Sequence, residues 1–198
     1  MATVALLATA CGPVGWPMFR FGPDHTGSSS DTSINQSAVS SSMVLAWTGA
    51  TANAVSSTPA VANGSVYVGS TDGRLYAWDA AGNTNCSGSP TTCAPLWSGA
   101  TGGGITSSPA VSNGVVYVGS SDHSLYAFDA AGNTNCGGTP RTCAPLWSAT
   151  TGGPIGSSPA VANGVVYVGS GDGNVYAFDA AGSRNCAGSP MVCAPLWS

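Results

Sequence analysis

The sequence is poor in charge, and each sign is carried by one residue type. It has no lysine and no glutamate. Its four arginines and eight aspartates make charged residues 6% of the chain, where ordinary domains have about a quarter. The net charge is −4 and the arginines are scattered. No basic stripe therefore exists to bind phosphates, which argues against nucleic-acid binding.

Long hydrophobic runs are also missing. No stretch approaches the roughly 20 apolar residues of a transmembrane helix, so the sequence predicts no helical membrane span. Hydrophobic residues nevertheless make up 43% of the chain, which is too apolar a composition for disorder. We expect a folded protein whose surface is wetted mainly by Ser, Thr, Asn and Gly.

Histidine is scarce, whereas cysteine is not. Only His25 and His123 are present, so pairs of cysteines would lack the further ligands of a zinc site. Local disulfides are favoured over metal binding, and such bonds persist where the surroundings oxidise, outside the cytoplasm. Cys11 has no counterpart in a repeat. The six cysteines that pair by position are Cys86 with Cys93, Cys136 with Cys143, and Cys186 with Cys193.

The sequence repeats itself with a period of 50 residues and no shift of register. Short β-like runs in units of roughly 40 to 50 residues are typical of a β-propeller, in which one repeat makes one four-stranded blade. We therefore predict an all-β fold, an incomplete propeller arc of about three to four blades. The markers of the period include Pro59, Pro109 and Pro159; Tyr67, Tyr117 and Tyr167; Asp72, Asp122 and Asp172; and Trp97, Trp147 and Trp197.

The middle repeat shows the strands expected in each blade. Residues 107–112 form the first strand, and Asn113-Gly114 is a hairpin turn, since both residues accept positive φ cheaply. The second strand, 115–120, is apolar almost throughout, so both of its faces should be covered by neighbouring blades. Tyr126 and Phe128 share one face of the third strand and should pack blade on blade. Asp129 closes that strand and should accept backbone N–H groups in the next turn.

The first residues resemble the end of an export signal. Met1 to Ala10 are small and apolar, and Cys11 follows small residues as the acylated cysteine of a bacterial lipoprotein does. We therefore treat Cys11 as a candidate lipid anchor, although no Lys or Arg precedes the apolar run. A start assigned too late in the gene would also explain this short segment.

The repeats divide the chain. Residues 1–11 are the export-signal remnant or lipoprotein-type N-terminus, and residues 12–42 are an entry segment and a Ser-rich linker. Met43 to Gly49 aligns with the last strand of a repeat, so the propeller repeats begin there. The expected units are the last strand of one blade at 43–55 and blades at about 56–105, 106–155 and 156–198.

Two stretches carry a resemblance to a known family. Residues 16–27 read WPMFRFGPDHTG, and residues 157–179 read SSPAVANGVVYVGSGDGNVYAFD. Together with the tandem copies they resemble the pyrroloquinoline-quinone-binding-like (PQQ-like) β-propeller family, including BamB-type lipoproteins that assist outer-membrane assembly. Residues 130–144 depart from the family, which has a short turn there. The resemblance implies that four tryptophans dock adjacent blades: Trp47, Trp97, Trp147 and Trp197.

The resemblance also implies seven or eight blades, so we expect the chain to be a fragment that lacks further blades of the same propeller. The third blade should then show a bare face rich in Val, Tyr and Phe, of the kind that marks a missing partner surface.

The functional hypothesis is an exported, non-enzymatic scaffold that binds a protein partner. The first alternative is a fragment of a PQQ-dependent quinoprotein dehydrogenase with PQQ and calcium, but such enzymes carry adjacent cysteines and a Glu that this chain lacks. The second is an extracellular carbohydrate-binding propeller. Asp24 and His25 fit a turn, so we predict no catalytic, cofactor-binding or metal-binding residue.

Overall fold

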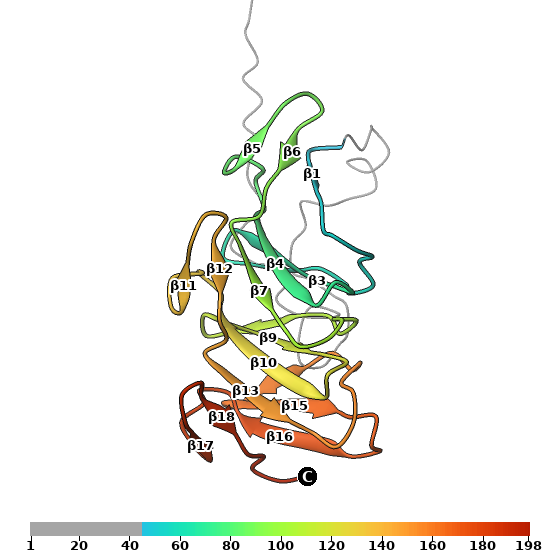
Figure 1. Ribbon diagram of the computed structural model, residues 1–198, viewed down its shortest axis with the longest axis vertical. Helices are drawn as coiled ribbons and strands as arrows, with labels where there is room; N and C mark the ends of the chain where they lie inside the picture. Colours follow the sequence, from blue (N-terminus) through green and yellow to red (C-terminus); the bar gives the residue numbers. More distant parts are fainter. Residues whose placement is uncertain (1–44) are drawn as a thin grey trace, which may run out of the picture.

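The structure, a computed structural model, describes residues 45–198. The expected export signal, the candidate lipid anchor Cys11 and the entry segment with its Ser-rich linker lie outside the described residues. Within 45–198 every regular element is a β-strand, in agreement with the all-β prediction. The three repeats form sheets stacked one after another along the long axis (Figure 1).

The first two repeats contribute the same six strands, and the third contributes five, because it has no counterpart of β7 and β13. The short strand before the first repeat is β1 (Thr48–Gly49). The first repeat has β2 (Ala60–Ala62), β3 (Ser65–Ser70), β4 (Arg74–Asp79), β5 (Cys86–Ser87), β6 (Thr92–Cys93) and β7 (Trp97–Ala100). The second has β8 (Ala110–Ser112), β9 (Val115–Gly119), β10 (Ser124–Asp129), β11 (Cys136–Gly137), β12 (Thr142–Cys143) and β13 (Trp147–Thr150). The third has β14 (Ala160–Ala162), β15 (Val165–Gly169), β16 (Val175–Asp179), β17 (Cys186–Ala187) and β18 (Val192–Cys193).

A blade is an antiparallel meander, ordered β2-β3-β4-β7 in the first repeat and β8-β9-β10-β13 in the second. The hairpin turn between β8 and β9 has the positive φ angles expected of Asn-Gly, 49° at Asn113 and 76° at Gly114. His123, in the turn between β9 and β10, has φ 72°. It therefore lies in the left-handed region, as residues in tight turns can.

The first strand of the second blade is shorter than expected. Strand β8 begins at Ala110, so residues 107–109 lie outside it. The two serines before it use their hydroxyls instead. Ser107 Oγ accepts the Gly119 N–H at 3.0 Å within its blade. Ser108 Oγ accepts the Thr58 N–H at 2.9 Å, and the Ser108 N–H is donated to Ser158 Oγ at 3.0 Å. These last two bonds connect the three blades at their inner ends.

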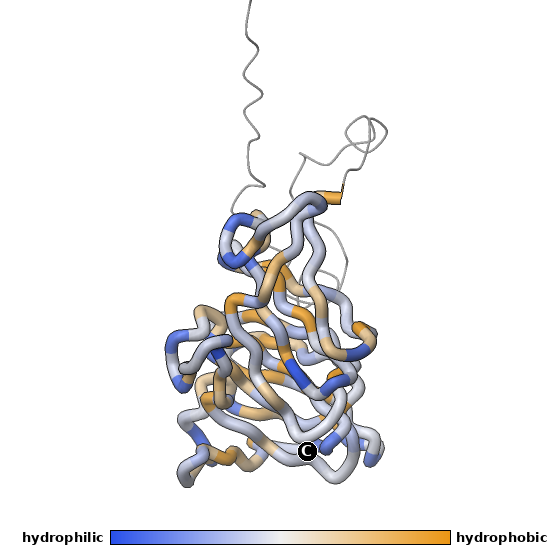
Figure 2. Tube along the Cα trace, turned by 45° about the horizontal axis from the view of Figure 1, so that its top comes forward, coloured by the Kyte–Doolittle hydropathy of each residue, from blue (hydrophilic) through white to orange (hydrophobic). Residues whose placement is uncertain are grey.

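The hydrophobic core lies between blades. Val116, Val118 and Phe128 of the second blade are fully buried against side chains of the first blade that include Tyr67 and Trp97. The second and third blades repeat this contact. In Figure 2 the hydrophobic colour follows the stacked strands, while the hydrophilic colour gathers at turns and hairpins. The apolar strand β9 of the second blade is thus covered on both faces, as its sequence predicts.

The connection at residues 130–144, expected to be a loop, contains a two-stranded hairpin. Strands β11 and β12 pair with each other, and β12 then pairs in parallel with β7 of the preceding blade. The result is a six-stranded sheet ordered β11-β12-β7-β4-β3-β2. The prediction of four-stranded blades holds for the first two blades, whose sheets gain two outer strands from the next repeat. The third blade has three strands, β14-β15-β16, and its expected fourth strand is a single bridge between Ala177 and Trp197.

Candidate functional site

Three disulfide-bonded hairpins lie along one side of the stack (Figure 1). The structure joins Cys86 to Cys93, Cys136 to Cys143 and Cys186 to Cys193, the pairs that the sequence favours, each with 4.0 Å between Cα atoms. The two cysteines of a hairpin are direct cross-strand partners. Each bond closes a small loop, for which the chain-entropy model gives about 2–3 kcal/mol.

An asparagine holds the base of each hairpin. The Asn135 side chain donates to the Pro145 carbonyl at 3.1 Å, and the Asn135 carbonyl accepts the Ala144 N–H at 2.8 Å. Its φ of 58° is one that asparagine adopts more readily than most residues. Asn85 and Asn185 repeat this arrangement. The base of each hairpin is therefore fixed by both the disulfide and this asparagine.

Each hairpin is attached to the blade before its own. The Ser98 N–H of the first blade donates to the Arg141 carbonyl at 3.1 Å, and the Ser148 N–H of the second blade donates to the Met191 carbonyl at the same distance. The Thr48 N–H bonds to the Thr91 carbonyl in the same way. The hairpin therefore acts as a clasp that covers the outer strand of its neighbour, and we call it the cystine clasp.

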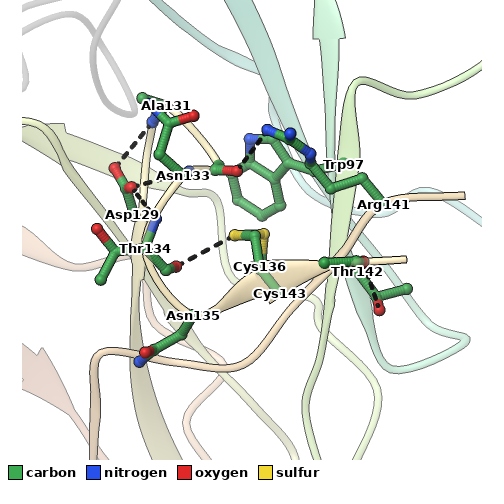
Figure 3. The surroundings of a disulfide bond; sticks show 12 residues. Trp97, Asp129, Ala131, Asn133, Thr134, Asn135, Cys136, Arg141, Thr142 and Cys143 are labelled. Atoms are coloured by element: carbon green, nitrogen blue, oxygen red, sulfur yellow. Dashed lines mark hydrogen bonds between the residues drawn. A yellow bond between two sulfur atoms is a disulfide. The ribbon is translucent and has the colours of Figure 1, made fainter. Parts of the chain in front are cut away.

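An aspartate at the end of the third strand orders the turn that leads into each clasp. Asp129 accepts the N–H groups of Ala131, Asn133 and Thr134 at 2.7–3.1 Å, as the sequence predicts (Figure 3). Burial acts to raise the pKa of Asp129, but the backbone N–H groups of Thr134, Asn133 and Ala131 outweigh it and lower that pKa. The carboxylate thus accepts these hydrogen bonds in its charged form.

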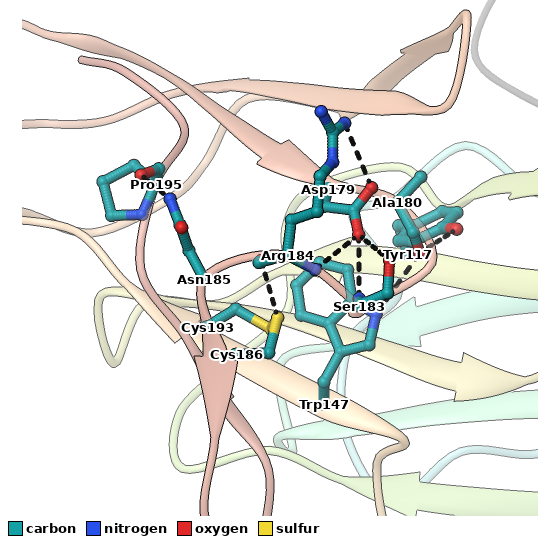
Figure 4. Close-up of polar contacts among 10 residues, drawn as sticks. All are labelled: Tyr117, Trp147, Asp179, Ala180, Ser183, Arg184, Asn185, Cys186, Cys193 and Pro195. Carbon is teal, nitrogen blue, oxygen red and sulfur yellow. Dashed lines mark hydrogen bonds and ion pairs between the residues drawn. A yellow bond between two sulfur atoms is a disulfide. The ribbon is translucent and has the colours of Figure 1, made fainter.

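In the equivalent turn of the third repeat, Asp179 also accepts hydrogen bonds from side chains (Figure 4). It accepts the Ser183 hydroxyl at 2.6 Å and pairs with the Arg184 guanidinium at 3.3 Å. The Ser183 hydroxyl and the backbone N–H groups of Arg184 and Ser183 lower the pKa of Asp179 to about 2, against the opposing effect of burial. This carboxylate is therefore ionised at any physiological pH.

A groove of about 780 Å³ runs between the base of the first clasp and the turn of the second. The Arg141 guanidinium donates to the Gly132 carbonyl at 2.9 Å beside Trp97 (Figure 3), which leaves further N–H groups for a ligand. Aliphatic, aromatic and cationic atoms thus meet in one open depression. Its lining includes Asn85, Pro95, Leu96, Trp97, Pro140 and Arg141.

The clasps share one backbone but carry different exposed side chains. Arg141 of the second clasp is replaced by Thr91 in the first and by Met191 in the third. Met191 is 40% exposed and the adjacent Val192 is 49% exposed. The row of clasps therefore displays polar, cationic and apolar contacts on three similar supports.

Three of the four predicted docking tryptophans, Trp47, Trp97 and Trp147, each donate to a main-chain carbonyl of the following repeat. Trp97 Nε1 and the Tyr67 hydroxyl of the first blade both donate to the Ala130 carbonyl of the second, at 3.2 and 2.9 Å. Gly132, at φ 67°, leaves room for the indole, since a Cβ there would overlap Trp97. Trp47 donates in the same way to the Ala80 carbonyl at 3.3 Å.

The second junction repeats the first. Trp147 Nε1 and the Tyr117 hydroxyl donate to the Ala180 carbonyl at 3.3 and 2.8 Å (Figure 4). Burial, with a smaller effect of the Asp179 charge, raises the pKa of Tyr117 to about 12. The tyrosine therefore remains a neutral donor well above physiological pH.

The third blade carries the same pair without a described acceptor. The rings of Tyr167 and Trp197 lie 6.0 Å apart at 47°, almost as in the other blades. Trp197 is 53% exposed and Val175 is 54% exposed, whereas Trp97 and Trp147 are buried. The third blade thus presents a partly apolar face, which is the feature expected of its open side.

The other acidic groups of residues 45–198 are also engaged in local structure. Asp122 accepts the Tyr126 hydroxyl at 2.7 Å and the Gly102 and Ser124 N–H groups at 2.6 and 2.9 Å. Asp72 and Asp172 also accept a tyrosine hydroxyl. Within residues 45–198 no three His, Cys, Asp or Glu side chains form a group that could hold a metal ion. The same part of the chain contains no helix of the length and apolarity that a membrane span requires.

Sequence reasoning missed the parallel pairing of each clasp with the preceding blade and the groove beside it. The available signal was the invariant spacing of the cysteine pairs together with the long connection that contains them. This signal predicts a closed loop, but it does not show which outer strand the loop covers.

Comparison with known protein families gives a match for this chain. The family model described as outer membrane protein assembly factor BamB matches residues 45–135 and 139–187, more than half of the chain. A search of the curated proteins finds no match.

Solved structures show the same fold. The quinohemoprotein alcohol dehydrogenase ADHIIG from Pseudomonas putida HK5 is 25% identical, with a TM-score of 0.64 over 85% of this chain and 25% of that one. The quinohemoprotein alcohol dehydrogenase from Comamonas testosteroni is 23% identical, with a TM-score of 0.67 over 96% and 28%. BamB from Moraxella catarrhalis is 19% identical, with a TM-score of 0.52 over 77% and 38%.

The chain therefore spans well under half the length of these natural structures and corresponds to part of a propeller. Its disulfides and its family both indicate an extracytoplasmic location. On the match of its repeats, the chain belongs to the PQQ_2 family of PQQ-like repeat β-propellers, whose model is described as outer membrane protein assembly factor BamB.

Proposed function

We propose that this protein is an exported, non-enzymatic β-propeller scaffold that binds another protein through its row of cystine clasps. Exposed loops on a rigid support are the usual place for binding residues. Here each support is closed by a disulfide and paired with the neighbouring blade. Residues at the clasp tips therefore lose little conformational entropy when a partner binds.

The groove beside Arg141 is the observation that carries this proposal. It combines an arginine with free N–H groups, two prolines and a leucine. Arginine is enriched among the residues that dominate protein interfaces. The matching family model is described as an outer membrane protein assembly factor, which supports the same class of role.

A dehydrogenase fragment is the second candidate, because the chain is 25% identical to the Pseudomonas putida quinohemoprotein alcohol dehydrogenase. The acidic side chains of residues 45–198 do not fit a calcium site. Asp79, Asp129 and Asp179 bind the turns that follow them, and Asp72, Asp122 and Asp172 each bind a tyrosine hydroxyl. We therefore propose that the chain holds neither PQQ nor calcium.

Site-specific photocross-linking in the cells that make the protein tests the scaffold role. A photoreactive amino acid at position 141 or 191 should give one discrete protein adduct, and the adduct at 191 should weaken when Arg141→Ala is added. The same group at Asn113, in a turn outside the clasps, is the matched control. Equal adducts from all three positions, or none from the clasps, would contradict the proposal.

The cofactor is tested separately. The purified chain is incubated with PQQ and Ca²⁺, passed over a desalting column, and examined for quinone absorbance and dye-linked alcohol oxidation. We expect neither. Retained absorbance with alcohol oxidation would establish the dehydrogenase role instead.

A further inference from the structure

The face of the first blade that lies away from the second blade is only partly covered by the described residues. In the second blade, the corresponding side chains Val116, Val118 and Phe128 are fully buried against the blade before them. In the first blade, Val66, Val68 and Trp78 form a small separate cluster with Trp47. Of residues 45–198, Trp47 and the short strand β1 represent the preceding blade there.

A cavity of about 260 Å³ lies on this face. Its walls are almost entirely apolar, and Val55 at its border is 49% exposed. Exposed apolar surface of this kind indicates a site that another segment covers. The lining consists of Trp47, Gly49, Thr51, Val55, Pro59, Val66, Val68 and Trp78.

The Trp78 indole is a second, independent sign of an occupant. The side chain is 3% exposed, yet none of the described residues accepts its Nε1–H. The equivalent residues of the other blades, Phe128 and Phe178, have no such donor. A buried donor without a partner destabilises the fold, so the complete site should supply a hydrogen-bond acceptor.

The 50-residue frame indicates the occupant. Strand β1 already stands where the fourth strand of a preceding blade belongs. The same frame aligns residues 15–20 in sequence with the second strand, 50 before β3. The run from Trp16 to Phe21, WPMFRF, carries three aromatic side chains and a methionine. Its backbone carbonyls can accept a hydrogen bond, and its proline is acceptable in an edge strand.

The tether to the cavity is long enough. Twenty-three residues lie between Phe21 and Leu45, and at roughly 3.3 Å per residue they can span up to about 75 Å. Closure of a flexible loop costs little more as its length grows. A segment so attached reaches an effective concentration of about millimolar, whereas a second copy must associate from dilute solution.

We propose that residues Trp16–Phe21 of the same chain dock on this face, fill the cavity and supply a backbone carbonyl to the Trp78 N–H. The entry segment then takes the part that the second strand of a preceding blade would play. The docking is intramolecular and does not depend on any partner protein.

Fluorine NMR on the full chain labelled with 5-fluorotryptophan tests this docking, because each of the six tryptophans gives a resonance assignable by a Trp→Phe variant. The triple variant Trp16→Ser/Phe19→Ser/Phe21→Ser should shift the Trp78 resonance toward that of the free amino acid. It should leave the Trp97 and Trp147 resonances in place. The control Ile34→Ser/Val39→Ser removes two apolar residues of the linker and should shift neither.

A peptide of residues 12–27 added to the triple variant should return the Trp78 resonance toward its original position. In the unsubstituted chain, the Trp78 indole hydrogen should exchange slowly at every protein concentration. An unchanged Trp78 resonance in the triple variant would overturn the proposal, as would rapid exchange in the unsubstituted chain. A Trp78 resonance that changes with protein concentration would assign the face to a second copy and overturn it as well.

Discussion

The junction between the second and third blades and the open face of the third blade contain the same residues in different surroundings. At the junction, Tyr117 and Trp147 are buried and both donate to the Ala180 carbonyl. On the open face, Tyr167 and Trp197 keep nearly the same ring geometry, but Trp197 is 53% exposed. The aromatic pair therefore assembles within its own blade, and its contribution to stability should depend on the blade that covers it.

Removing one indole from each place should give the largest difference. Trp147→Ala leaves a cavity in the core between two blades and should lower the free energy of unfolding by about 3–5 kcal/mol. Trp197→Ala should cost no more than about 1 kcal/mol, because much of that ring is already in contact with water. Urea unfolding followed by circular dichroism measures both. Equal losses would contradict the assignment of the third face as open.

The glycine beneath an indole should matter more than a glycine in a turn. Gly132→Ala places a methyl group in the Trp97 ring at a positive φ, and we expect a loss of about 3 kcal/mol. Gly114→Ala has a similar φ of 76° with no atom within 4 Å, and should lose only about 1 kcal/mol. The same unfolding measurement applies. A similar loss for both variants would show that the indole has room to move.

Opening a clasp should make a closed junction behave more like the open face. The double variant Cys136→Ser/Cys143→Ser should lower stability by about 2–3 kcal/mol through loss of the closed loop. It should also speed the exchange of the Ser98 amide hydrogen, which bonds to the Arg141 carbonyl. The Ser148 amide, held by the third clasp, is the internal control in the same NMR experiment. A change at Ser148 as large as that at Ser98 would contradict the local action of a clasp.

The smallest difference concerns one hydroxyl. Tyr117→Phe leaves the Ala180 carbonyl with a single donor and should cost about 1 kcal/mol. Tyr167→Phe should be neutral within about 0.5 kcal/mol, since no described residue accepts its hydroxyl. Differences in urea midpoint between these variants and the unsubstituted chain report the values. A costly Tyr167→Phe would reveal an acceptor on the third face.

Much of this architecture is predictable from the repeat, because the period, the apolar strands and the Asn-Gly turns act locally or between equivalent neighbours. Asn113 and Gly114 adopt the expected turn, and Asp129 binds the N–H groups that follow it. The acceptor of Trp97 could not be foreseen. It is the main-chain carbonyl of Ala130, a group that every residue carries and that only tertiary packing selects.

The pairing of the clasp with its neighbouring blade could not be predicted from the sequence either. The cysteine spacing indicates a closed loop at residues 136–143, but parallel pairing with β7 depends on how one blade rotates against the next. The first strand of the second blade is also shorter than the sequence predicts, since β8 begins at Ala110 and not at residue 107. The hydroxyls of Ser107 and Ser108 take hydrogen bonds that a longer strand would have made with backbone groups.

Hydrogen exchange of the tryptophan indoles tests the central claim most directly, because each junction is held by an indole N–H bound to the next blade. In ¹⁵N-labelled protein, Trp97 and Trp147 should exchange only at the rate of global unfolding, whereas Trp197 should exchange orders of magnitude faster. Comparable protection of Trp197 and Trp147, or rapid exchange of all three, would contradict an arc of blades locked by indole-to-carbonyl bonds and open at its third blade.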